Sequence, residues 1–256
     1  MPLLSLQKID QNRTDSAGNA LMIILILIIL LAALTAVVMR SSNRASTNIS
    51  TETARMQAEK LIRQAKGLET SVQRLTSVNR CSENEISFVN TTTTRDYTNA
   101  QAPTDHHCDL FHVDGAGMSY SNPDVSALDS SLSALSDYGQ FVFTGGHCVL
   151  GLGSDDNSAC TDSEVALLAV VPHVNLATCL QINQLMSITN PSGAPPEDSL
   201  DETAATFTGS YTAATDPELG EGASGSSLQK HTTGCLKNTS GAWTGSYIFY
   251  HMLITR

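Results

Sequence analysis

Residues 20–39 read ALMIILILIILLAALTAVVM, a run with one hydroxyl, that of Thr35, and no charge. A helix of twenty residues rises about 30 Å, which matches the hydrocarbon thickness of a bilayer. This stretch therefore predicts a transmembrane helix. A cleaved secretory signal is the alternative, but its apolar core is shorter, about 7–15 residues, and ends in a small-x-small cleavage site. Here the run continues through Val37, Val38 and Met39 to Arg40.

The pattern after this run predicts that the helix continues to about residue 80. Between Thr47 and Val78 there is no proline and one glycine, Gly67. Apolar residues recur there at alternating spacings of four and three, which places them on one helix face. We call this face the seam: Ala54, Ala58, Leu61, Ala65, Leu68, Val72 and Leu75. Its alanines favour a helix docked closely on its own globular domain over a free coiled-coil stalk, in which small side chains bury little area.

Six cysteines follow the apolar run and none precedes it. An even number, widely spaced and without CxxC pairs, favours disulfides over zinc. Among the fifteen connectivities, we favour Cys81–Cys108, Cys148–Cys160 and Cys179–Cys235. A catalytic cysteine would need an unpaired thiolate beside a histidine. The cysteines place the body in an oxidising space and the residues before the helix in the cytoplasm.

The composition of the chain argues against nucleic-acid binding. The chain has 256 residues, with 14 Lys+Arg against 25 Asp+Glu and a net charge of −11. Nucleic-acid binding depends on clustered basic residues, so it is not expected. The predicted organisation is a cytoplasmic leader (1–18), a long helix (19–80) and an extracytoplasmic globular domain (81–256).

The globular domain reads as α+β, with the long helix packed on a small antiparallel sheet. A strand is expected at 140–144, ended by Gly145-Gly146. Residues 165–171, ended by Pro172, read as a buried strand or as the start of a helix. A helix is expected at 175–188 and a terminal strand, covered on both faces, at 247–255. The polar segment 191–228 is the best candidate for a mobile or partner-binding surface.

The leader ends in Ser16-Ala17-Gly18, and the apolar helix follows at once. With the amphipathic continuation and the disulfide-bearing domain, this architecture resembles the type IV pilin-like proteins, including the pseudopilins of secretion systems. The resemblance implies cleavage after Gly18 by a prepilin peptidase and N-methylation of Asn19. It also implies packing of the N-terminal helix against other pilin-like subunits.

The chain departs from that family at two positions. It has Asn19 where the family usually has an aromatic residue, and Ile23 where the family usually has a glutamate that pairs with a neighbouring subunit. A minor component therefore fits better than a major pilin. Further along, FHVDGAG (111–117), GCLKN (234–238) and YIFYHML (247–253) resemble a group of uncharacterised bacterial proteins of the same build.

The densest metal-type cluster contains His106, His107, Cys108 and His112. Its spacing matches no closed zinc motif. A solvated loop, with a hydrogen bond from the His112 ring to the 114–117 backbone, is the preferred interpretation. Calcium is a weaker candidate, since it takes six to eight oxygen ligands. The oxygens nearest the small disulfide loop belong to Asp155, Asp156, Asp162 and Glu164, and a second acidic group comprises Asp216, Glu218 and Glu221. No GxSxG elbow, P-loop or dinucleotide fingerprint is present.

The sequence thus predicts a non-enzymatic pilin-like subunit of a bacterial envelope filament or secretion pseudopilus, without a cofactor. The predicted location is the inner membrane, crossed once, with the body in the periplasm or exposed on a filament. The rival hypothesis is an uncleaved, membrane-anchored binding module, and an anchored enzyme ranks third.

Overall fold

A computed structural model describes residues 14–153, 160–200 and 206–256. Within these ranges, the side chains of 14–20, 36–49 and 222–223 are not described. The chain divides into two units, Met1–Thr51 and Glu52–Arg256. The second unit includes the seam as well as the globular body, and the two units are treated separately below.

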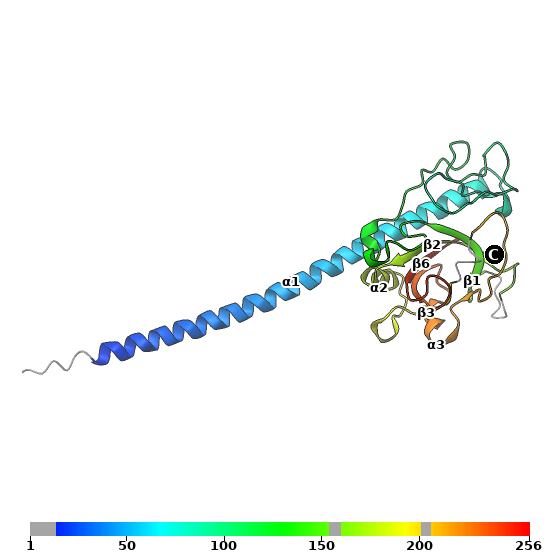
Figure 1. The fold of residues 1–256 in the computed structure, drawn as a ribbon. Helices are drawn as coiled ribbons and strands as arrows, with labels where there is room; N and C mark the ends of the chain where they lie inside the picture. The colour runs from blue at the N-terminus through cyan, green and yellow to red at the C-terminus, as the bar shows by residue number, and fades with distance from the viewer. Residues whose placement is uncertain (1–13, 154–159, 201–205) are drawn as a thin grey trace, which may run out of the picture. The chain divides into compact units, whose positions relative to one another are not determined.

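Three α-helices and six strands make up the regular structure of the described residues (Figure 1). The helices are α1 (Thr14–Ser77), α2 (Leu176–Leu185) and α3 (Gly222–Gly225). The strands are β1 (Val142–Val149), β2 (Ala166–Val174), β3 (Glu197–Asp198), β4 (Glu218–Leu219), β5 (Thr233–Asn238) and β6 (Tyr247–Ile254). Short 3₁₀ turns lie at Glu83–Glu85, Val125–Ala127, Ser130–Leu132, Pro191–Gly193 and Ser226–Leu228.

The strands form one mixed sheet in the order β3-β5-β6-β2-β1-β4. The four central strands are antiparallel, whereas the outer strands β3 and β4 pair parallel with β5 and β1. The two outer strands also approach each other. The Asp198 carboxylate accepts a hydrogen bond of 2.7 Å from the N–H of Gly220, and the N–H of Glu197 donates to Ser224 Oγ at 3.0 Å. These contacts bring the sheet close to closure.

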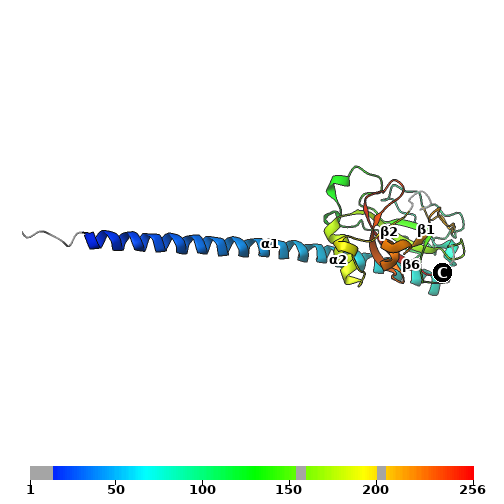
Figure 2. The same cartoon turned by 90° about the horizontal axis from the view of Figure 1, so that it is seen from below.

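Each face of the sheet is covered by apolar side chains, because successive strand residues point to opposite faces. On one face, Phe143, Phe249 and Leu253 share a core with the α1 seam. On the other, Leu168, Tyr250 and other strand residues pack with residues of the later loops. Figures 1 and 2 show the seam-bearing part of α1 running beside β2 and β6. The terminal strand is therefore covered on both faces, as predicted.

The seam prediction is confirmed. All seven seam residues are buried, and none has more than 4% of its surface exposed. Helix α1 ends at Ser77, where Arg80 adopts a left-handed conformation (φ 62°) and the N–H of Cys81 donates to the carbonyl of Leu75. This turn directs the chain back towards the sheet.

Two parts of the predicted fold class are wrong. The sheet is mixed rather than antiparallel, since both outer strands run parallel to their neighbours. In addition, no helix of the described residues is long and apolar enough to cross a bilayer, which overturns the transmembrane helix expected over 20–39.

Several element boundaries also differ. Helix α1 begins at Thr14, inside the expected leader. Strand β1 runs through Gly145-Gly146 and β2 runs through Pro172, the residues expected to end them. The proline is accommodated because the β2–β6 register shifts between Val171 and Val174, as at a bulge.

The segment 191–228, expected as a mobile or partner-binding surface, is structured in its described parts. It provides β3, β4 and α3. Its apolar residues Leu200, Phe207, Leu219 and Leu228 are buried, which explains why these parts pack on the sheet.

Candidate functional site

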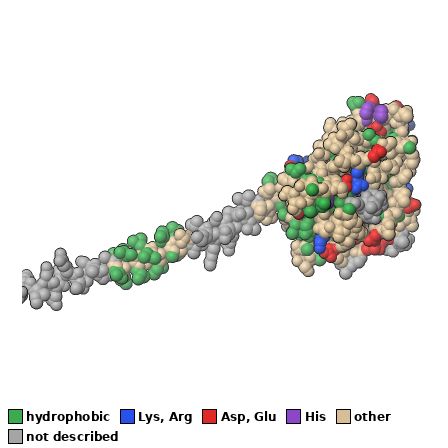
Figure 3. Space-filling model, in the orientation of Figure 1, with side chains coloured by type: hydrophobic (Ala, Val, Ile, Leu, Met, Phe, Trp, Pro, Cys, Tyr) green, Lys and Arg blue, Asp and Glu red, His purple; other side chains and the backbone are tan. Residues whose placement is uncertain are grey.

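The described part of α1 in the first unit has an apolar surface on all sides. Between Leu21 and Leu34, twelve large aliphatic side chains each have 49–68% of their surface exposed. Thr35 hides its hydroxyl by donating to the carbonyl oxygens of Leu31 and Ala32, at 3.0 and 2.9 Å. Figure 3 shows these side chains as a green band on the helix. We call residues 21–35 the apolar band.

The predicted processing residues Gly18 and Asn19 lie within α1, and their side chains are outside the described set. Ile23, at the position where pilin-like proteins usually carry glutamate, is 54% exposed. Among the side chains described between 21 and 35 there is no charged group that could pair with a neighbour.

The predicted disulfides are confirmed. They join Cys81 to Cys108, Cys148 to Cys160 and Cys179 to Cys235. The first ties the end of α1 to the loop at 106–112, and the third ties α2 to β5. Disulfides are typical of proteins in an oxidising, extracytoplasmic compartment.

A groove of about 850 Å³ lies between α1 and the end of β6. Beside it, His251 of β6 links the sheet to the helix. Its Nε2 lies 2.9 Å from the Glu69 carboxylate, and its Nδ1 lies 2.6 Å from Thr233 Oγ1. Lys66 donates to the same carboxylate at 2.5 Å. Because a carboxylate only accepts, Nε2 donates to Glu69 and Nδ1 accepts from the Thr233 hydroxyl.

Burial and hydrogen bonding together favour the ionised form of Glu69 and the neutral form of His251. Burial raises the pKa of Glu69, but hydrogen bonds from Lys66 and His251 outweigh it, so the pKa is lowered. Burial lowers the pKa of His251, and Glu69 opposes that effect in part.

A hydroxyl, an imidazole and a carboxylate in series also occur in hydrolases. Here Thr233 and His251 have only 5% and 3% of their surface exposed, so a substrate cannot reach the hydroxyl. The arrangement therefore fastens helix to sheet. Sequence reasoning missed it, because Glu69 and His251 lie 182 residues apart and share no motif.

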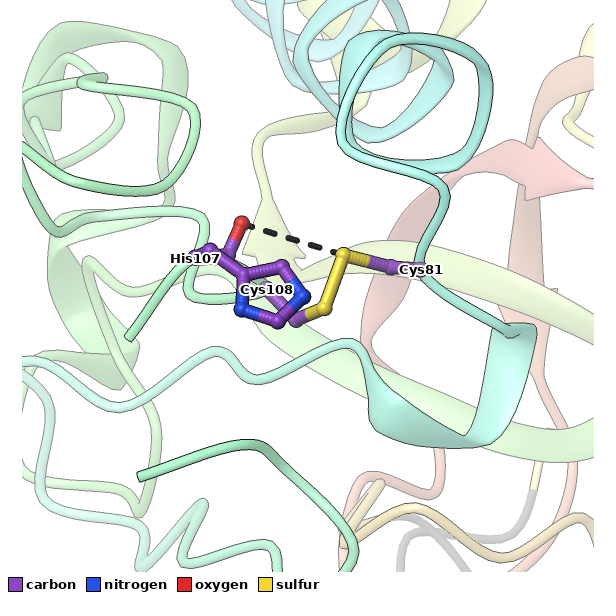
Figure 4. A group of neighbouring side chains, drawn as sticks. All are labelled: Cys81, His107 and Cys108. Atoms are coloured by element: carbon purple, nitrogen blue, oxygen red, sulfur yellow. Dashed lines mark hydrogen bonds between the residues drawn. A yellow bond between two sulfur atoms is a disulfide. The ribbon is translucent and has the colours of Figure 1, made fainter. Parts of the chain in front are cut away.

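The predicted histidine cluster divides into two parts. His107 lies against the Cys81–Cys108 disulfide, with its carbonyl oxygen 3.7 Å from the Cys81 sulfur (Figure 4). Potential ligand atoms of these three residues lie within 4.8 Å of one another. Both sulfurs are bonded to each other, so neither is a thiolate, and this group is not a zinc site.

His106 and His112 form the other part. Their rings are tilted towards each other, with centroids 4.4 Å apart and planes inclined by 31°. The ring of His112 also contacts the 114–117 backbone, but in the opposite sense to the prediction: its Nδ1 accepts a 3.3 Å hydrogen bond from the N–H of Asp114.

The calcium candidates are not brought together where the structure describes them. Asp162 accepts from the N–H of Ala213 at 2.7 Å, and Glu164 accepts from both the N–H and the hydroxyl of Thr161. Each carboxylate thus accepts a hydrogen bond from a backbone N–H. Asp155 and Asp156 lie outside the described residues.

The second acidic group lines a small pocket of about 340 Å³. Glu218 accepts a 2.6 Å hydrogen bond from the N–H of Cys160. A hydrogen bond shared with Glu218 raises the pKa of Glu221 to about 7. Nearby, burial raises the pKa of Asp198 to about 6. These carboxylates are thus partnered by the backbone or by one another.

Comparisons with models of protein families, with curated proteins and with solved structures find no match.

Proposed function

We propose that this protein is a non-enzymatic, pilin-like subunit of a bacterial envelope filament or secretion pseudopilus, and a minor component of it. The observation that carries the proposal is the apolar band, a helix surface that is aliphatic on all sides and exposed. Soluble monomeric proteins rarely leave so large an apolar surface uncovered.

Burial of a large aliphatic side chain stabilises an assembly by about 1.5–3 kcal/mol. With twelve such side chains in the band, association that covers it is strongly favoured. In this proposal the band first associates with the inner membrane. A prepilin peptidase cleaves after Gly18, and Asn19 becomes the methylated first residue. Other pilin-like subunits cover the band when the protein enters the filament.

The second unit supports a structural role. The buried seam and the contact between Glu69 and His251 hold residues 52–77 of α1 on the sheet. Force on this part of the helix would therefore pass directly to the body. The three disulfides suit a periplasmic or extracellular body.

The minor role follows from Ile23. In the family that the chain resembles, a glutamate at this position pairs with the N-terminus of the neighbouring subunit. Ile23 offers an exposed aliphatic side chain instead, so it contributes to the band but cannot form that ion pair.

The test uses polar substitutions in the full-length protein, expressed in a bacterium that has a pilin-like machine. Leu25→Gln combined with Ile29→Gln makes two exposed positions of the band polar. Val113→Gln combined with Val125→Gln is the matched control, because these side chains are 82% and 66% exposed on the body. We expect the first pair to abolish crosslinking to other pilin-like subunits and the control to leave it intact.

The N-terminal mass gives a second readout. A mature chain that begins at a methylated Asn19 is expected. A chain that retains Met1 and is isolated as a stable detergent monomer, without crosslinks to pilin-like subunits, would contradict the proposal.

The second candidate is an extracytoplasmic binding module whose leader is not cleaved. The groove of about 850 Å³ beside Glu69 favours it, since its size is that of a small-molecule site. This candidate predicts the monomer just described, so the same experiment separates the two functions.

A further inference from the structure

We propose that His106 and His112 bind a divalent transition-metal ion of the zinc type, with Asp109 and Asp114 as the carboxylates that orient the two imidazoles. The proposal concerns the outer surface of the body and does not depend on the function proposed above. Figure 3 shows histidine side chains gathered at one place on this surface.

The two rings are close and accessible. Their centroids are 4.4 Å apart, and the side chains of His106 and His112 are 53% and 40% exposed. Both line a pocket of about 450 Å³, together with polar groups of Asn90, Ser119 and Tyr120. An ion from solvent can therefore reach both imidazoles, and water can complete its coordination.

Each imidazole has a carboxylate on its Nδ1 side. His106 Nδ1 lies 2.7 Å from Asp109 Oδ2, and His112 Nδ1 lies 3.4 Å from Asp114 Oδ2. A carboxylate only accepts, so the Nδ1 of His106 carries the proton and its Nε2 presents a lone pair. Metal-binding histidines commonly show this arrangement, in which a carboxylate fixes the tautomer and increases the basicity of the ligand nitrogen.

His112 has a choice between two partners. Its Nδ1 accepts from the N–H of Asp114 at 3.3 Å, or donates to the carboxylate of the same residue. In the second arrangement its Nε2 also presents a lone pair. A small rotation of the ring therefore prepares the second ligand.

The backbone brings the two histidines together. His106 adopts a left-handed conformation (φ 63°), and its carbonyl accepts from the N–H of Asp109 at 3.1 Å. A Cβ at Gly115 would overlap the Asp109 carbonyl, so glycine lets the 112–117 turn lie against the 106–109 turn. The neighbouring Cys108 is fixed by its disulfide to Cys81. The two turns that carry the histidines are thus held against each other before an ion binds.

The donor set selects the ion. Imidazole nitrogens suit zinc, copper and nickel, whereas calcium takes oxygen ligands. His107 does not belong to the site: its Nδ1 contacts Asp105 at 2.5 Å, and it lies against the disulfide. It therefore provides a matched control.

The test is a calorimetric titration of the full-length protein in detergent with Zn²⁺. A second series repeats the titration with excess Ca²⁺ present. His106→Asn removes one imidazole, and asparagine tolerates the left-handed backbone there. His112→Gln removes the other, and His107→Gln is the control. Thermal unfolding of each variant verifies that it is folded.

We expect one Zn²⁺ per chain, with binding weakened at least tenfold by His106→Asn and by His112→Gln. We expect Asp109→Asn to weaken binding by about tenfold as well, since loss of an orienting carboxylate has an effect of about that size. His107→Gln and excess Ca²⁺ should leave Zn²⁺ binding unchanged. The proposal is overturned if the wild type binds no Zn²⁺, if folded His106→Asn and His112→Gln variants bind it equally well, or if Ca²⁺ displaces it.

Discussion

Substitution of Ala65 by leucine distinguishes a docked helix from a free coiled-coil stalk, because the change in the free energy of unfolding has opposite signs in the two cases. Ala65 is fully buried, with 0% of its surface exposed, in the core shared by α1 and the sheet. Leucine adds three carbon atoms at a site already enclosed by the sheet. Overpacking of this kind costs about 1–3 kcal/mol. We therefore expect Ala65→Leu to lower the free energy of unfolding by that amount.

A free coiled-coil stalk would respond in the opposite way. There, Ala65 would be a small knob that buries little area, and each added carbon would contribute about 0.8 kcal/mol on burial. The same substitution would then stabilise the protein by up to about 2.4 kcal/mol per helix and would favour a dimer.

Urea unfolding of the full-length protein in detergent, with the disulfides intact, measures the difference. Met56→Leu is the control, since Met56 lies on the same helix and is 61% exposed. Its effect should be within about 0.5 kcal/mol of zero. Stabilisation by Ala65→Leu, or a shift towards dimer, would refute the docked arrangement.

Two further predictions concern the second unit. Because the folded pKa of Asp198 is raised to about 6 from 3.8, its contribution to stability is complete below about pH 4 and is lost as the pH rises through 6. Asp198→Asn should remove a gain of about 2 kcal/mol between pH 7 and pH 4. The difference between the urea unfolding curves of the two proteins removes the contributions of His173 and His251, whose lowered pKa values act in the opposite direction. It retains, with the contribution of Asp198 itself, the part of the raised pKa of Glu221 that the Asp198 charge causes. The double substitution Cys179→Ser and Cys235→Ser opens a loop of 56 residues and should cost about 4 kcal/mol, seen as a lower melting temperature; an unchanged melting temperature would show that this loop is already constrained by its packing.

The helix seam and the disulfides were predictable from the sequence for clear physical reasons. A spacing of four and three residues reports directly which side of a helix is buried, and the seam from Ala54 to Leu75 kept that spacing throughout. The pair Cys148–Cys160 flanked one short loop, and the pair Cys179–Cys235 bracketed the long polar one. Both kinds of inference use local spacing, which a single sequence contains.

The sheet was harder to predict, because its glycine and its proline serve tertiary packing. Gly145 lies inside β1, where a Cβ would come within 3.0–3.2 Å of Phe207, Tyr211 and the Ser210 carbonyl. It allows a later loop to approach the strand, whereas in the sequence a glycine pair predicts the end of a strand. Pro172 lies where the register of β2 shifts, and the next residue, His173, has a φ of 62°.

The candidate sites show the same difference between local spacing and tertiary packing. The sequence indicates the histidine loop because its residues are close together in the chain, but the pairing of His106 with His112 depends on how two turns meet. The contact of Glu69 with His251 depends on the docking of α1 on the sheet. Contacts of this kind follow from the fold and have no signature in the order of the residues.

The way the sheet ends has a consequence for how copies of this protein can join. Exposed strand edges are templates on which another chain can add a strand, the route to strand exchange and aggregation. Here the outermost strands of the described sheet are two residues long, and Asp198 ties one to the segment that follows the other. Growth by strand addition to this sheet is therefore disfavoured, so copies of this chain are not expected to join edge to edge through it.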